Sequence, residues 1–97
     1  MSKESVFQAR LIKKIRAKMP EAIIFKNDPR YMQGAPDLLV LNGDKWAALE
    51  CKKNAMASHR PNQDYYIGKM NEMSFAAFVY PENEKEILDA LQRTLQR

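Results

Sequence analysis

The chain has 97 residues, of which 45% are hydrophobic and 29% charged, so it suits one small globular domain and is too hydrophobic to be disordered throughout. A single cysteine, Cys51, excludes an internal disulfide, and with the single histidine, His59, it also excludes a Cys/His zinc site. No apolar run approaches the roughly 20 residues that span a bilayer, and the N-terminus lacks the apolar stretch of a signal peptide. We therefore expect residues 1–97 to form one domain of an intracellular, cytoplasmic protein, with no membrane partner.

Basic residues outnumber acidic ones by 16 to 12, which gives a formal net charge of +4 at pH 7. The surplus lies in the first 20 residues, where six lysines and arginines accompany one acidic residue, Glu4. This balance favours an anionic partner, with nucleic acid as the first choice. Because the core of so short a chain is thin, a dimer interface would add to its stability.

The hydrophobic pattern predicts three helices and four strands in the order αβββαβα. An amphipathic helix is expected over residues 3–19, where Phe7, Leu11 and Ile15 recur every four positions before Pro20. The other elements are expected as strands at 22–26, 38–41, 45–52 and 75–80, and as helices at 61–73 and 82–96. Because a helix connects the last two strands, these should run parallel, and the fold class is α/β, a mixed four-stranded sheet flanked by helices.

The second and third expected strands form a hairpin around Asn42-Gly43. A two-residue turn at these positions places Asp37 opposite Ala48 and diagonal to Glu50, whereas a four-residue loop places Asp37 directly opposite Glu50. In either register both carboxylates and Lys52 point to one face of the sheet, at the end of the hairpin remote from the turn.

Two adjacent carboxylates at the rim of a buried sheet repel each other, by about 4 kcal/mol at a separation of about 4 Å and an effective dielectric constant near 20. A divalent cation offsets this repulsion, and a site with oxygen donors only favours Mg²⁺ or Mn²⁺. Asp37 and Glu50 are therefore candidate metal ligands, with the backbone carbonyl of Cys51 as a third. Beside a nucleic-acid phosphate, such a site suits phosphodiester hydrolysis, with Lys52 acting on the attacking water or on the charge of the transition state. The alternative is structural, with an ion pair between Glu50 and Lys52 and a turn capped by Asp37.

At these positions the sequence resembles the PD-(D/E)xK nuclease superfamily, through Gly34-Ala35-Pro36-Asp37, then Glu50-Cys51-Lys52, and through the αβββαβ order of its restriction-endonuclease-like core. A helix start that reads Arg60-Pro61-Asn62-Gln63 narrows the resemblance to the VRR-NUC (virus-type replication-repair nuclease) family. Relatives often have Ser-Pro-x-Gln there, so Arg60 departs from the pattern.

The resemblance implies that Asp37 and Glu50 bind Mg²⁺ or Mn²⁺, that Lys52 is catalytic and that Gln63 lies close to the site. We therefore expect Asp37, Glu50, Lys52 and Gln63 to form the catalytic set of a metal-dependent endodeoxyribonuclease without a small-molecule cofactor. Members of this size resemble Holliday-junction resolvases, which implies branched DNA as the substrate and a homodimer as the working form.

Glu4 falls within the apolar arc of the first helix, where a carboxylate is costly unless it is paired. Many PD-(D/E)xK nucleases carry an acidic residue there near the metal, so Glu4 is either a further ligand or a residue that stabilises the helix N-terminus. His59 is expected to be an exposed loop residue. The candidate phosphate-binding residues are Lys26, Arg30, Lys53 and Arg60.

Two other functions fit the same sequence. The first is a nucleic-acid-binding module that has the same fold and no catalysis. The second is a protein-interaction domain that uses the basic first helix, and it predicts no salt-dependent affinity for DNA.

Overall fold

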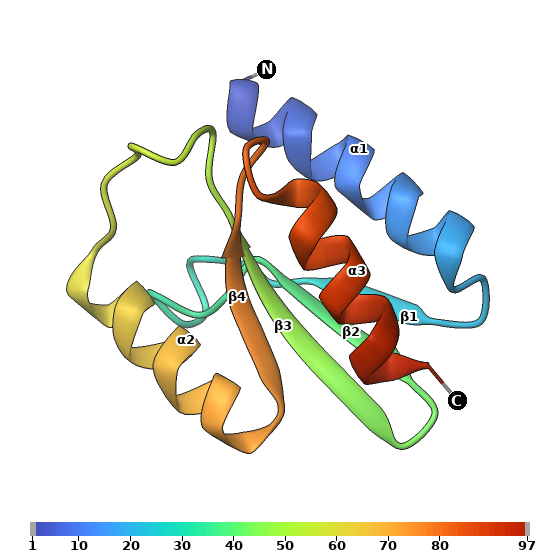
Figure 1. Ribbon diagram of the computed structural model, residues 1–97. Coiled ribbons are helices and arrows are strands. Elements are labelled where there is room, and N and C mark those ends of the chain that lie inside the picture. The colour runs from blue at the N-terminus through green and yellow to red at the C-terminus, as the bar shows by residue number, and fades with distance from the viewer. Residues whose placement is uncertain (1, 97) are drawn as a thin grey trace.

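The computed structural model describes residues 2–96 as one mixed sheet with the strand order β1-β2-β3-β4 and helices on both faces (Figure 1). The strands run antiparallel except for β3 and β4, which are parallel as predicted. No helix within these residues is long and apolar enough to cross a membrane. In chain order the elements are α1 (Lys3–Lys18), β1 (Ile23–Lys26), β2 (Leu38–Asn42), β3 (Lys45–Cys51), α2 (Pro61–Met73), β4 (Phe75–Val79) and α3 (Glu84–Leu95).

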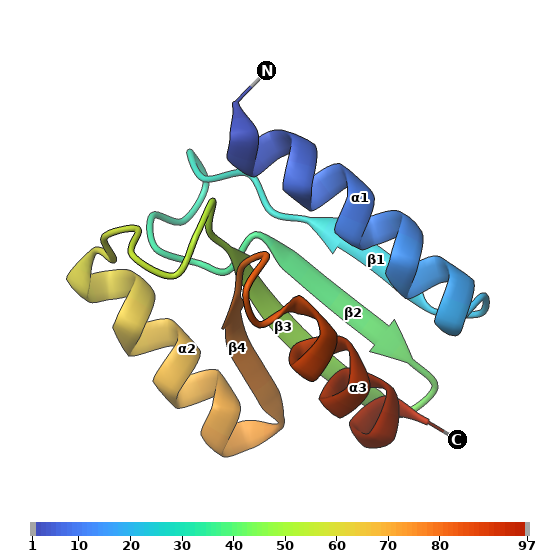
Figure 2. The same cartoon turned by 45° about the horizontal axis from the view of Figure 1, so that its top comes forward.

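The two faces of the sheet carry separate apolar clusters because side chains alternate along each strand. Helices α1 and α3 cover one face and α2 covers the other, as Figures 1 and 2 show. The larger cluster joins α1 and α3 to inward side chains of the strands, including Leu38, Val40 and Leu49. The smaller one lies under α2, around Ala48 and Ile67. Strands β2 and β3 are therefore central and apolar on both faces, as predicted.

The boundaries of the helices follow from their caps. Ser2 Oγ accepts a hydrogen bond from the Ser5 backbone N–H at 3.0 Å and so starts α1. The predicted start of the last helix at residue 82 is two residues early. Asn83 Oδ1 accepts from the Tyr80 N–H at 2.9 Å and holds a turn at that point. Helix α3 consequently begins only at Glu84.

The hairpin register corrects the predicted turn at Asn42-Gly43. Asn42 pairs with Lys45 inside the ladder, so the two turn residues are Gly43 and Asp44, and Gly43 has a φ of 68°. The amide of Asn42 is buried and donates to the Leu95 carbonyl at 2.7 Å, which ties this strand end to the last turn of α3. Of the two registers considered, the structure therefore has the one that aligns position 37 with position 50.

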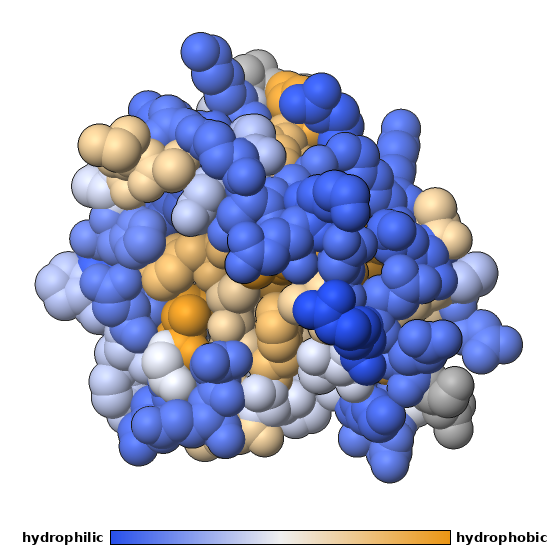
Figure 3. Space-filling view, viewed as in Figure 1, coloured by the Kyte–Doolittle hydropathy of each residue, from blue (hydrophilic) through white to orange (hydrophobic). Residues whose placement is uncertain are grey.

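The outer edge of β4 is partly closed by asparagine side chains. The Ala76 N–H donates to Asn71 Oδ1 at 3.0 Å, and Asn83 Nδ2 donates to the Phe78 carbonyl at 3.0 Å. These backbone groups face away from β3, since the Val79 carbonyl, one residue on, accepts from Lys52 on the β3 side. In Figure 3, apolar surface gathers over β4 between the hydrophilic outer faces of α2 and α3.

Candidate active site

The carboxylates of Asp37 and Glu50 lie side by side where β2 begins and β3 ends. The Asp37 N–H donates to Glu50 Oε1 at 3.2 Å, and the Cys51 N–H donates to Asp37 Oδ2 at 2.8 Å. Each acid is thus held by the backbone of the other strand, as the observed register requires. Cys51 itself points its thiol into the opposite cluster, so of this residue only the backbone borders the acids.

Asp37 is held in place by the strand beside it. Its carbonyl accepts from the Asn27 N–H at 2.8 Å, and the Asn27 side chain donates to the Pro36 carbonyl. The loop before Asp37 is fixed to α2, because Asn62 Nδ2 donates to the Gln33 carbonyl at 3.2 Å. A Cβ at Gly34 would lie 2.5 Å from Asn62 Cγ, and this residue has a φ of 90°, so the position requires glycine.

Gln63 connects the acids to the lysine. Its Nε2 donates to Glu50 Oε2 at 3.0 Å, while its Oε1 accepts from Lys52 Nζ at 2.8 Å and from the Arg60 N–H at 3.0 Å. The carboxylate needs a donor and the ammonium needs an acceptor, so the chemistry of the two partners fixes the orientation of the amide. Gln63 reaches this position because it is the third residue of α2, where its side chain caps the start of the helix.

Lys52 is buried, with 7% of its surface exposed, and its ammonium group has two acceptors. Besides Gln63, Nζ donates to the Ser58 carbonyl at 3.1 Å. Among residues 2–96 it has no carboxylate within 4.0 Å, so the alternative of a Glu50–Lys52 ion pair is wrong. An ammonium has three N–H groups, so one is left for a group that enters the site.

Burial dominates the electrostatics of the two acids, and the positive charge of Lys52 offsets it only in part. Desolvation, followed by repulsion from Asp37, raises the pKa of Glu50 to about 7. The pKa of Asp37 is also raised, chiefly by desolvation, although the hydrogen bond from Cys51 opposes the shift. Both ionised acids are therefore costly in the folded protein until a cation joins them.

These residues fit a hard divalent cation. All candidate donors are oxygens, the kind of ligand that Mg²⁺ and Mn²⁺ prefer, and Asp37 Oδ1 accepts no hydrogen bond from the described part of the chain. No group of three histidine, cysteine, aspartate or glutamate side chains converges within residues 2–96. Two carboxylates that leave the other positions to water and substrate oxygens are an arrangement typical of Mg²⁺.

Glu4 lies near the acids, but it is exposed and not within the apolar interface expected from the helical wheel. The buried stripe of α1 begins only at Phe7, because the first turn projects beyond the sheet. The charge of Glu4 nevertheless contributes to the raised pKa values of Asp37 and Glu50. Glu4 also lines a cleft of about 890 Å³ between the start of α1 and the segment after β3, together with Lys52 and Lys53.

The candidate phosphate-binding residues occupy different surroundings. Lys53 is exposed and lines the same cleft. Lys26 is exposed at the end of β1, and its charge slightly lowers the pKa of Asp37. Arg60 is exposed at the start of α2. Arg30 is engaged by Asp28, with Nη2 and Oδ2 2.9 Å apart, so the structure does not bring it to the acids.

Sequence reasoning missed two contributors to the site. The Ser58 carbonyl is a backbone group, for which the sequence carries no signal. His59 is an exposed loop residue, as expected, but its ring stacks on Phe78 with centroids 3.9 Å apart. Its Nδ1 also lies 3.0 Å from Asp64 Oδ1.

Two solved structures share this fold. One, described as a VRR_NUC domain, superposes with a TM-score of 0.74 at 22% sequence identity, over 92% of this chain and 97% of its own. The other, described as a VRR_NUC domain protein, has a TM-score of 0.71 at 14% identity, over 99% of this chain and 90% of its own. No family model and no curated protein sequence matches the chain. The resemblance to VRR-NUC domains inferred from the sequence is thus confirmed at the level of the fold.

Proposed function

We propose that the chain is a VRR-NUC-type nuclease, a Mg²⁺- or Mn²⁺-dependent endodeoxyribonuclease. The observation that carries this proposal is the connected array Asp37–Glu50–Gln63–Lys52 at the rim of the sheet. The array combines two desolvated acids with a buried ammonium whose direction is set by two acceptors. Burying charged groups costs free energy, and clusters of such groups are typical of functional sites.

Each residue has a distinct task in the proposed reaction. Asp37 and Glu50 would hold the cation, which when bound polarises the phosphoryl group and lowers the pKa of a nearby water. Lys52 donates its remaining N–H to the reacting group and offsets the negative charge that develops on the phosphorane oxygens. Gln63 keeps the ammonium of Lys52 from collapsing onto the carboxylate of Glu50, because its amide lies between them.

We infer that the substrate is DNA, with branched DNA as the preferred form. The cleft that Lys52 lines also contains Lys3 and Lys53 against one acid, Glu4, so a phosphate that enters it meets a surplus of positive charge beside the buried ammonium. The basic face of α1 adds an attraction that does not depend on sequence.

Cleavage assays with labelled DNA test the proposal directly. We expect Mg²⁺- or Mn²⁺-dependent cutting, lost with a chelator, on a panel of single-stranded, nicked, flap and four-way substrates. The four-way and flap substrates should be cut fastest. Binding without cleavage on every substrate, RNA included and with Mn²⁺ present, would instead favour the non-catalytic binding module.

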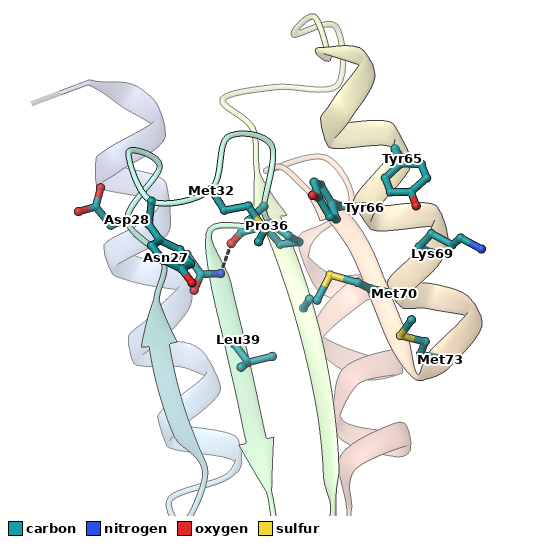
Figure 4. Close-up of a pocket in the computed structure, with 13 residues that line it drawn as sticks. Asn27, Asp28, Met32, Pro36, Leu39, Tyr65, Tyr66, Lys69, Met70 and Met73 are labelled. Atoms are coloured by element: carbon teal, nitrogen blue, oxygen red, sulfur yellow. Dashed lines mark hydrogen bonds between the residues drawn. The ribbon is translucent and has the colours of Figure 1, made fainter.

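We further propose that the working form is a homodimer that pairs through the uncovered part of the sheet. Helix α2 covers β3 and β4, which leaves Ile23 and Phe25 of β1 with more than half of their surface exposed on the same side. Beside them lies an apolar hollow of about 490 Å³, where Leu39 of β2 and Met70 of α2 point into the space between their elements (Figure 4).

This surface suits a protein and not a nucleic acid, because its lining is apolar and Lys69 is its one basic member among the described residues. It places the projecting side chains of Ile23 and Phe25 beside a hollow, a combination that would suit a self-complementary two-fold interface. A symmetric dimer would supply the two active sites needed for paired cuts across a junction.

Replacing Phe25 by glutamate is expected to convert the dimer to a monomer, because a charge at the centre of an apolar interface is left desolvated and unpaired. Sedimentation velocity at about 20 μM protein would show the change. Lys13→Glu, on the exposed side of α1, is the matched control and should remain dimeric. A monomeric wild-type protein at this concentration would overturn the dimer proposal but not the nuclease proposal.

A further inference from the structure

The short segment that leads into α2 holds the lysine of the site from two directions. The Ser58 carbonyl accepts from Lys52 Nζ at 3.1 Å, and the Arg60 N–H donates to Gln63 Oε1, which accepts from the same Nζ. The two backbone groups belong to the residues directly before and after His59. The direction of the third N–H of Lys52 therefore depends on where the backbone around His59 lies.

The side chain of His59 ties this backbone to two elements. Its ring stacks on Phe78 of β4 with centroids 3.9 Å apart and planes inclined by 19°. Its Nδ1 meets Asp64 in the first turn of α2. Phe78 pairs with Glu50 in the parallel ladder, so the stack is anchored on the strand position beside one of the acids.

Little else anchors the segment between β3 and α2. It has no regular secondary structure, and most of its residues are exposed. The Ala57 N–H donates to the Asn54 carbonyl within the segment itself, and the Ala55 N–H reaches Glu82 near its other end. At the end next to α2, the ring of His59 packs against the sheet through Phe78.

We propose that His59 is a positioning residue of the proposed nuclease, which aims the ammonium of Lys52 by stacking its ring on Phe78. The inference rests on the proposed function for its kinetic consequence. Its structural consequence, an ordered ammonium group, is independent of that function. A misplacement of a reacting group by about 1 Å costs up to about a hundredfold in rate. The stack of His59 on Phe78 therefore affects the rate, although His59 does not touch the reacting atoms.

The test follows Lys52 Nζ by ¹H–¹⁵N NMR at low temperature and compares it with cleavage kinetics. In the wild type we expect a slowly exchanging ammonium signal, assigned by its absence in Lys52→Met. His59→Ala should lose this signal while the unfolding midpoint and the remaining amide spectrum persist. Its kcat should fall about tenfold to a hundredfold, with KM for DNA nearly unchanged.

Two substitutions separate the stack from the hydrogen bond. His59→Phe preserves the ring and should restore both the signal and kcat to within about threefold of wild type, because the stack supplies most of the anchoring. Asp64→Asn should have a small effect, since the Asp64 side chain is 59% exposed and an exposed pair contributes little. Glu72→Gln, which alters the exposed pair with Lys69 on the same helix, is the matched control.

The proposal is overturned if His59→Ala keeps both the ammonium signal and the wild-type kcat, or if the wild type shows no such signal. It is equally overturned if phenylalanine fails to rescue a folded protein. Should the wild type not cleave DNA at all, the NMR comparison still decides the role of His59, and the nuclease proposal fails separately.

Discussion

Asp37→Asn is expected to abolish metal-dependent cleavage and, at the same time, to stabilise the metal-free protein at pH 8. Asparagine keeps an oxygen that accepts from the Cys51 N–H, so the local geometry is retained. The substitution removes a desolvated charge and its repulsion from Glu50, which should raise the free energy of unfolding by on the order of 1 kcal/mol. Loss of one of two carboxylate ligands should also abolish stabilisation by Mg²⁺.

Thermal unfolding with and without Mg²⁺ at pH 8 checks this expectation, alongside cleavage of a four-way substrate. Asp44→Asn is the matched control, because Asp44 is an exposed acid at the turn of the same hairpin. It should leave cleavage and the response to Mg²⁺ unchanged. A destabilised Asp37→Asn protein that still responds to Mg²⁺ would contradict the metal site.

The pH dependence of the metal-free wild type follows from Glu50. Its pKa is about 7 in the folded protein, against an ordinary value of 4.5, so the folded state holds this proton more tightly than the unfolded state. The free energy of unfolding should therefore fall as pH rises between these two values, and the penalty is complete above pH 7. In Asp37→Asn the pKa of Glu50 should be lower, because the repulsion from the Asp37 carboxylate, the second cause of the raised pKa, is removed. A carboxyl-selective NMR titration measures both values.

Lys52→Met is expected to lower the rate of cleavage by about a thousandfold or more, while DNA binding and metal binding persist. Methionine retains the buried apolar stem, and Gln63 Oε1 still accepts from the Arg60 N–H, so the fold should survive. The loss should appear in kcat, because the third N–H of Lys52 is the group that meets the reacting phosphate. Single-turnover kinetics and the Kd of a labelled junction separate the two effects.

Lys53→Ala is the contrasting variant, because Lys53 is exposed in the same cleft and has no part in the hydrogen-bonded array. It should weaken DNA binding, reduce the salt dependence by about one counterion and leave kcat at saturation close to wild type. If Lys52→Met instead loses DNA affinity and keeps its rate at saturation, the proposed role of Lys52 is wrong.

The sequence was most informative where local patterns determine the structure. The alternation along the hairpin predicted that Asp37, Glu50 and Lys52 share a face, and Pro61 correctly marked the first residue of α2. The register of the β2–β3 hairpin was harder to predict, because it depends on whether Asn42 is a turn residue or pairs with the opposite strand. In the structure Asn42 pairs with Lys45, and its side chain donates to the Leu95 carbonyl, which is far away in the sequence.

The sequence could not predict those hydrogen-bond partners of the site residues that are distant in sequence or belong to the backbone. The family pattern placed Gln63 near the site, but only the structure shows that its amide binds an acid, a lysine and the start of a helix together. The expected competitor, an ion pair of Glu50 with Lys52, was reasonable from spacing alone. It fails because Lys52 binds oxygens of the segment 58–63 instead.

The asparagines along β4 have a consequence for how this small protein behaves in a crowded cell. An open strand edge invites the edge of another molecule, and that is how ordered aggregates grow. Here Asn71 and Asn83 occupy backbone groups that an incoming strand would need. Pairing with a further strand at this edge should therefore be less favourable, because an incoming strand would have to displace both side chains.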